Sequence, residues 1–232
     1  MVFTNKFEVI RTLMFLIKNL KYFKFKFLIP SEYLDNINKL EPELLRKKGI
    51  DTIIWDVEGT ITEYRGKISD KENKFLTKFK GFNNYILTNA PEEMCNELSN
   101  ALPEIPIITG YYHILKKKVI IRKIINHKKI YVLVENNKQI AIKKPINKLN
   151  IQRIRKPSVL LLKKVLFIEN ITPKNSVMIG DNTITDIFPA NYLGMFTIQI
   201  KPPTNATSFP LTLRMLRHCE YILVWIFKLI KK

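Results

Sequence analysis

The stretch "IIWDVEGTIT" at residues 53–62 places a carboxylate directly after an apolar run and then turns the chain with Gly59 and Thr60. A short apolar run bounded by turn residues is typical of a buried strand in a parallel sheet. An acid at the end of such a strand, followed by turn N–H groups, suits a site where a carboxylate meets a phosphate. Asp56 is therefore the first candidate catalytic residue, and Glu58 is the second.

Two more apolar stretches predict strands that end in polar residues. The stretch "NYILTNA" at 84–90 carries Thr88, and "NSVMIGDN" at 175–182 carries Asp181. Segments with helical character separate these strands, which is typical of an α/β fold with a parallel sheet and right-handed crossovers. The carboxyl ends of the strands form the active edge of such a sheet. We therefore expect Thr88 and Asp181 to lie beside Asp56.

Turn and helix signals predict the remaining elements. Gly49 marks a helix end, and Pro91 and Pro157 mark helix starts. The expected set comprises one helix or two short ones over 33–48, helices over 71–79 and 91–102, a helix from Pro157, a helix over 211–231, strands over 105–109 and 195–200, and a hairpin with Asn136 and Asn137 at its turn.

The composition favours one compact domain. The chain has 232 residues, of which 46% are hydrophobic, and this suffices for a substantial core. Its two cysteines, Cys95 and Cys219, lie far apart, so neither a zinc site nor a disulfide framework is predicted, and a reducing compartment is expected. No signal-peptide pattern is evident, and no apolar run approaches the roughly 20 residues that a bilayer requires.

The net charge of +19 favours anionic partners, either anionic lipid or phosphorylated substrates. Base-composition bias in the genome is an alternative cause, because the basic residues are mostly Lys and the chain is also rich in Ile and Asn. Arginine clusters, RNA-binding aromatic signatures and zinc fingers are absent from the sequence, so no nucleic-acid partner is expected.

Four motifs, in order along the chain, resemble the haloacid dehalogenase (HAD) superfamily. They are "DVEGT" with Asp56 and Glu58, "LTNA" with Thr88, "KPS" with Lys156, and "GDNTITD" with Asp181 and Asp186. The resemblance implies a Rossmann-like fold, in which a parallel sheet has flanking helices and a small insert lies between the third strand and the Lys motif. It also implies a phosphatase that uses Mg²⁺ and forms an aspartyl-phosphate.

The resemblance also implies a role for each motif residue. Asp56 would be the nucleophile, Glu58 the acid and base, and Thr88 and Lys156 the groups that contact the phosphate. The Mg²⁺ ligands would be Asp56, the backbone carbonyl of Glu58, Asp181 and Asp186, and the further substrate-binding residues would be Gly59, Thr60 and Asn89. A cation between the phosphoryl group and the attacking carboxylate removes their repulsion, which is the physical reason for this set.

Several of these residues have structural alternatives. Thr88 could cap the helix that begins at Pro91, and Asp186 could be only a helix N-cap. Lys144 also precedes a proline, but the helix-length spacing to Asp181 favours Lys156.

Glu58 departs from the family, whose phosphatases have Asp at this position. Glutamate keeps acid–base chemistry with a similar intrinsic pKa. Its extra methylene shifts the carboxyl by about an ångström, and misplacement on that scale can cost about 10²-fold in rate. We expect an altered rate or leaving-group preference, with decay of the site as the alternative.

Two longer stretches are similar to one branch, the subfamily IIIA phosphatidylglycerophosphate phosphatases. They are the entry region at 27–62 and "GDNTITDIFPANYLGMFTIQIKPP" at 180–203. The branch resemblance implies a lipid phosphate substrate at a membrane surface. A phosphatase of a small soluble phosphate, and a non-catalytic phosphate- or membrane-binding protein, are the alternatives.

The motifs divide the chain into five expected segments. These are a basic amphipathic N-terminal segment (1–30), a first part of the HAD core (31–110), a basic insert or small cap (111–155), a second part of the core (156–210) and a basic amphipathic C-terminal helix (211–232). The insert is either a basic lid or a solvated face. The two ends either dock on anionic lipid or pack on the domain. The expected location is the cytoplasm, at the inner face of a membrane, with an organelle as the alternative.

Overall fold

The computed structural model describes residues 25–64, 66–113, 118–135, 138–142, 151–156 and 158–201. Most of the predicted N-terminal amphipathic segment, the C-terminal helix, the Asn136 and Asn137 turn and Lys144 lie outside these residues. The described strands form one ten-stranded sheet, in the order β1-β10-β9-β2-β3-β4-β5-β6-β7, with β8 paired to β4.

The first half of the sheet is parallel and carries the predicted motif residues. It comprises β1 (Glu32–Leu34), β10 (Phe196–Ile200), β9 (Ser176–Gly180), β2 (Thr52–Trp55), β3 (Asn83–Leu87) and the start of β4 (Ile107–His113). All five contacts between neighbours in this half are parallel. This mostly parallel sheet agrees with the predicted α/β fold.

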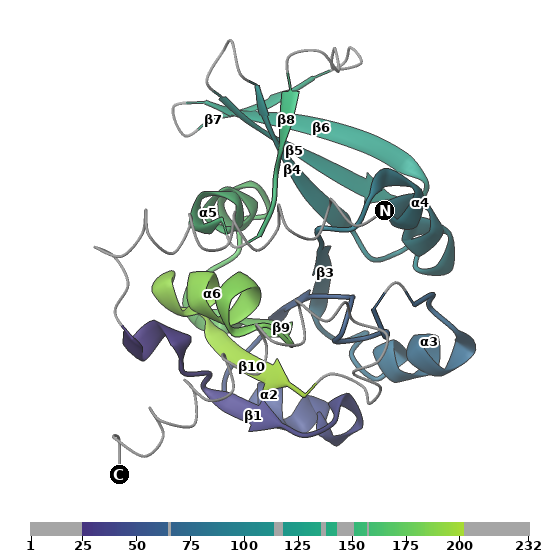
Figure 1. Cartoon of the computed structure of the whole chain (residues 1–232), viewed down its shortest axis with the longest axis vertical. Helices are drawn as coiled ribbons and strands as arrows, with labels where there is room; N and C mark the ends of the chain where they lie inside the picture. The colour runs from purple at the N-terminus through teal and green to yellow at the C-terminus, as the bar shows by residue number, and fades with distance from the viewer. Residues whose placement is uncertain are drawn as a thin grey trace, which may run out of the picture.

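The second half of the sheet is antiparallel and shares β4 with the first half. It comprises β5 (Lys118–Ile125), β6 (Lys128–Glu135), β7 (Lys138–Ala141) and β8 (Ile151–Ile154). β4 continues past its parallel partner and pairs with β5 on one side and β8 on the other, above the core in Figure 1. The predicted hairpin is confirmed by the pairing of β6 with β7.

Helices cover both faces of the parallel half (Figure 1). On one face, α3 (Asp70–Thr77) and α4 (Glu92–Ala101) pack with Trp55 in one core cluster. On the other face, α5 (Val159–Ile168) and α6 (Phe188–Tyr192) pack with Ile54. Neighbouring residues of β2 thus enter opposite cores, as the alternation of a strand requires. The other helical elements are η2 (Phe25–Leu28), η3 (Ile37–Lys39), α2 (Pro42–Lys47), η5 (Pro173–Asn175) and η6 (Thr183–Ile187).

Three strands, β1, β5 and β8, were not predicted from the sequence. The expected helix over 33–48 is wrong in its first part, where β1 pairs with β10 and Ser31 exchanges hydrogen bonds with Thr197. Tertiary pairing overrides local propensity here. Of the other two, β5 is buried on both faces, which leaves no polar–apolar alternation in its sequence. β8 is only four residues long and is recognisable only by its pairing with β4.

No helix within the described part of the chain is long and apolar enough to cross a membrane.

Gly110 lets α5 approach β4 closely. A Cβ at this position would clash with Leu161 Cδ1 and would lie 3.3 Å from Leu161 Cδ2. We predict that Gly110→Ala lowers the free energy of unfolding by about 1–3 kcal/mol through overpacking. Chemical denaturation measures this change. Gly81→Ala is the control, because its Cβ would meet only Arg46 Nη2, at 3.5 Å. Equal losses in the two variants would contradict this account of Gly110.

Candidate active site

Asp56 lies where β2 ends, in a turn that glycine makes possible. Its backbone N–H donates to Ile179 O on β9 (2.9 Å), and its side chain is buried. Gly59 adopts a φ of +86°, a conformation that other residues rarely take. Thr60 Oγ1 donates to Asp56 Oδ2 (3.2 Å). The turn formed by Gly59 and Thr60 therefore orients the Asp56 carboxylate.

The N–H groups of this turn bond within the turn itself. Gly59 N donates to Thr62 O (2.7 Å), and Thr60 N donates to Val57 O (3.1 Å). In this structure Gly59 and Thr60 therefore shape the loop, and their part in substrate binding stays a prediction. Glu58 is half-buried, and its backbone forms an isolated β-bridge with Thr62 in the same turn.

Lys156 joins two of the candidate carboxylates. Its Nζ donates to Asp56 Oδ1 and to Asp186 Oδ1, the latter at 2.7 Å, and all three side chains are buried. Burial alone would lower the pKa of Lys156, but the carboxylates of Asp186 and Asp56 outweigh this effect and raise it. Lys156 therefore stays charged and neutralises one of the two carboxylates.

Asp186 lies on η6, and its side chain packs against Gly180 and accepts a hydrogen bond from Lys156. Asn182 N donates to Asp186 Oδ2 (3.2 Å), and a Cβ on Gly180 would lie 2.5 Å from the same oxygen. Burial raises the pKa of Asp186 to about 6, which Lys156 opposes and Asp56 reinforces. The N-cap of η6 is Asn182, whose Oδ1 accepts from two backbone N–H groups. Asp186 is thus not a helix cap.

Three carboxylates form a candidate metal centre. Asp56, Asp181 and Asp186 each offer an oxygen, and these atoms lie within 4.8 Å of one another in a buried position. Hard oxygen ligands in such a group are those that Mg²⁺ and similar cations prefer. Among the described residues, this group does not include the carboxylate of Glu58.

The end of β3 contributes Thr88 and Asn89. The buried Thr88 Oγ1 accepts from Ala90 N (3.0 Å), so the hydroxyl stabilises the turn before α4, whose N-cap is Pro91. Asn89 Oδ1 accepts from Lys156 N (2.8 Å), and its Nδ2 donates to Lys156 O (3.3 Å). Asn89, which we predicted as a substrate-binding residue, therefore clamps the backbone of the lysine.

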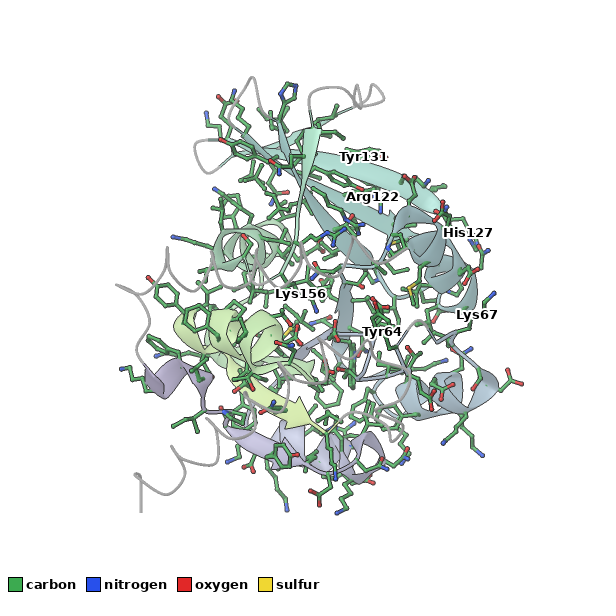
Figure 2. All side chains as sticks on the ribbon, viewed as in Figure 1. Tyr64, Lys67, Arg122, His127, Tyr131 and Lys156 are labelled. Carbon is green, nitrogen blue, oxygen red and sulfur yellow. The ribbon has the colours of Figure 1, made fainter. Side chains whose placement is uncertain are left out.

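The structure thus brings Asp56, Lys156, Asp181 and Asp186 into one buried group. Sequence reasoning missed the clamp by Asn89, because the partner lies 67 residues away. It also missed the cap by Asn182, although an Asn followed by Thr at a helix start is a recognisable capping signal. Figure 2 labels Lys156 at the centre of the molecule.

One family model matches part of the chain. The model of the HAD-hydrolase-like family matches residues 153–204, less than a quarter of the chain, and this range contains Lys156, Asp181 and Asp186. The match supports a HAD-type hydrolase. No curated protein matches the chain.

One solved structure is similar, an uncharacterized protein from Listeria monocytogenes serotype 4b. Identity is 18%, the TM-score is 0.41, and the similarity covers 70% of this chain and 86% of that chain.

Proton competition should control metal binding at this centre. Because burial raises the pKa of Asp186 to about 6, its carboxyl is protonated below that pH and ionised above it. We predict that the affinity for a divalent cation weakens about tenfold per pH unit below pH 6 and levels off above it. Calorimetric titration with Mg²⁺ between pH 5 and 7.5 measures this, and Asp186→Asn should remove the pH dependence. An affinity independent of pH in the unsubstituted chain would contradict the prediction.

Proposed function

We propose that the chain is a Mg²⁺-dependent phosphomonoester hydrolase that works through an aspartyl-phosphate on Asp56. The observation that carries this proposal is the buried group of three carboxylates within 4.8 Å, with Lys156 Nζ bonded to two of them. Mg²⁺ held there by Asp56, Asp181 and Asp186 would neutralise the charge of the phosphoryl group and align it for attack.

The first half-reaction transfers the phosphoryl group to the protein. A carboxylate oxygen of Asp56 attacks phosphorus, and the bond from phosphorus to the leaving oxygen breaks. Glu58 gives its proton to that oxygen, so the alcohol leaves neutral. Thr60 and Lys156, which bond the two oxygens of Asp56, fix its orientation for attack.

The second half-reaction returns the protein to its starting state. Glu58, now ionised, takes a proton from water, and the water oxygen attacks the phosphorus of the aspartyl-phosphate. The bond between phosphorus and the Asp56 oxygen breaks, which releases inorganic phosphate. Lys156, held in place by Asn89, contributes a fixed positive charge that stabilises both transition states.

The substrate that we propose is phosphatidylglycerophosphate, at an anionic membrane surface at the inner face of the membrane. Two features support this choice: the resemblance of residues 27–62 and 180–203 to lipid phosphatases, and the net charge of +19. The antiparallel strands after β4 would then face the substrate as a basic cover.

Loss of the nucleophile tests the mechanism. We predict that Asp56→Asn lowers Mg²⁺-dependent phosphate release to background for every active compound in a screen of lipid and soluble phosphomonoesters, because an amide oxygen is a poor nucleophile. Asp70→Asn is the control, since Asp70 is exposed in the first turn of α3. Persistent turnover in Asp56→Asn would exclude the aspartyl-phosphate mechanism.

Substrates whose leaving groups differ in basicity test the role of Glu58. We predict that Glu58→Gln slows hydrolysis of an alkyl phosphate by about 10²–10⁴-fold, because the alkoxide needs a proton in the transition state. The loss should be much smaller for p-nitrophenyl phosphate, whose leaving oxygen is weakly basic. Both losses are measured as kcat/KM, which reports the steps up to the aspartyl-phosphate and therefore excludes the later activation of water by Glu58. Glu58→Asp, which keeps the acid, serves as the matched variant. Equal losses for both substrates in Glu58→Gln would show that Glu58 is not the acid.

A further inference from the structure

Arg122 of β5 is buried with a donor that the described residues leave unused. The side chain is 1% exposed. Its Nε donates to Thr109 Oγ1 (3.0 Å), and its guanidinium lies over the ring of Tyr111, 5.4 Å from the centroid. Nη1 lies 3.4 Å from Glu92 Oε1, whereas the buried Nη2 has no hydrogen-bond partner among the described residues. Burying a charged donor without an acceptor is costly, and an anionic acceptor stabilises a guanidinium most strongly.

This guanidinium lies at the same edge of the sheet as the candidate active site. Thr88 N donates to Ile108 O (3.4 Å), so Thr109, the partner of Arg122, is level with the end of β3. β5 is three strand spacings from β2, or about 14 Å. The contact with Glu92 shows that Arg122 leans toward α4, which begins just after Thr88. In Figure 2, Arg122 lies in the upper sheet and Lys156 lies below it.

A second arginine, Arg153 on β8, contacts the turn just before α4. Arg153 is paired with Tyr111 across the strands, and its Nη2 donates to Ala90 O. Burial raises the pKa of the Cys95 thiol, and the positive charges of Arg122 and Arg153 oppose this shift. Two guanidinium groups therefore converge on the start of α4.

The start of α4 is itself favourable for an anion. The N-cap is Pro91, which makes no side-chain capping bond, and the N–H groups in the first turn of a helix attract negative charge. Glu92 supplies one carboxylate here, but it is half exposed and also pairs with Lys129 at 2.8 Å. Because Glu92 is exposed and is shared with Lys129, it stabilises the buried guanidinium only weakly, and another anion can replace it.

We propose that Arg122 and Arg153 bind a second anionic group of the substrate, and that Glu92 occupies this place when the substrate is absent. The inference rests on the proposed phosphatase activity and narrows its substrate to phosphomonoesters that carry a second phosphate group. That group is the diester of a lipid headgroup or a second phosphate of a soluble compound, and both offer the oxygens that a guanidinium binds in pairs.

The test compares substrates that differ only in the second phosphate. One pair is glycerol 3-phosphate and glycerol 1,3-bisphosphate, and the lipid arm is short-chain phosphatidylglycerophosphate. We expect Arg122→Met and Arg153→Met to lower the ratio of kcat/KM for two-phosphate over one-phosphate substrates by about 10- to 100-fold. Glu92→Gln, which removes the competing carboxylate, should raise this ratio. Arg46→Met is the control, because Arg46 is an exposed residue of α2 that forms an ion pair with Glu43 and lies over the ring of Phe82.

The direction in which Glu92→Gln changes this ratio distinguishes an anion-binding role of the arginines from a purely structural one. If Arg122 and Glu92 only hold α4 in place, both substitutions lower kcat/KM for all substrates by similar factors, and the proposal is overturned. If Arg122→Met fails to fold, Arg153→Met and Glu92→Gln still decide, since both residues are at least partly exposed. A changed ratio for the bisphosphate alone assigns a soluble substrate, and a change for the lipid alone assigns a headgroup.

Binding without turnover separates this proposal from the proposed activity. Calorimetry measures how much more tightly glycerol 1,3-bisphosphate binds than glycerol 3-phosphate. If no phosphomonoester is hydrolysed but this preference exists and needs Arg122, the activity is wrong and the anion site stands. If hydrolysis occurs and the preference is absent, the anion site is wrong and the activity stands.

Discussion

The buried contact of Lys156 with Asp56 and Asp186 is the interaction on which the site depends. It joins the end of β2, the connection before α5 and the helical turn after β9, across 100 and 30 residues of sequence. Two buried carboxylates repel each other, so bringing them together requires a cation between them. The lysine supplies this charge within the protein itself. The same arrangement leaves a net negative group to which a divalent cation can bind beside Asp181.

The contacts around this group explain why small and polar residues occupy the neighbouring strand ends. Gly180 has no side chain because Asp186 fills that space, and Thr60 bonds the second oxygen of Asp56. Asn89 fixes the lysine through its backbone and not its charge, so the Nζ remains available to the carboxylates. A parallel sheet makes these contacts possible, because it gathers the ends of separate strands at one edge.

Local patterns in the sequence were enough to predict the parallel core and the motif residues at its edge. An apolar run, a glycine turn and a Pro at a helix start are each set by neighbouring residues, so β2, β3 and β9 could be recognised without a partner. The strand β1 could not, because its partner β10 is far away in the sequence. The strand β5 could not, because burial on both faces leaves no polar–apolar alternation in its sequence. Arg122 could not be singled out either: in the sequence it is one basic residue among several, and only the fold shows that it is buried and bonded to Thr109.

The antiparallel strands are connected to the edge of the sheet that carries Asp56 and Lys156. They share β4 with the core, and Gly110 on that strand packs directly against α5. The last of them, β8, ends two residues before Lys156, while its Arg153 bonds the turn that carries Asn89. Any group that binds Arg153 therefore acts on the same turn that clamps the lysine. Under the proposal that Arg153 binds the distant part of a substrate, this binding would be coupled to the placement of the Lys156 charge beside Asp56, which is how remote binding energy can improve the alignment of reacting groups.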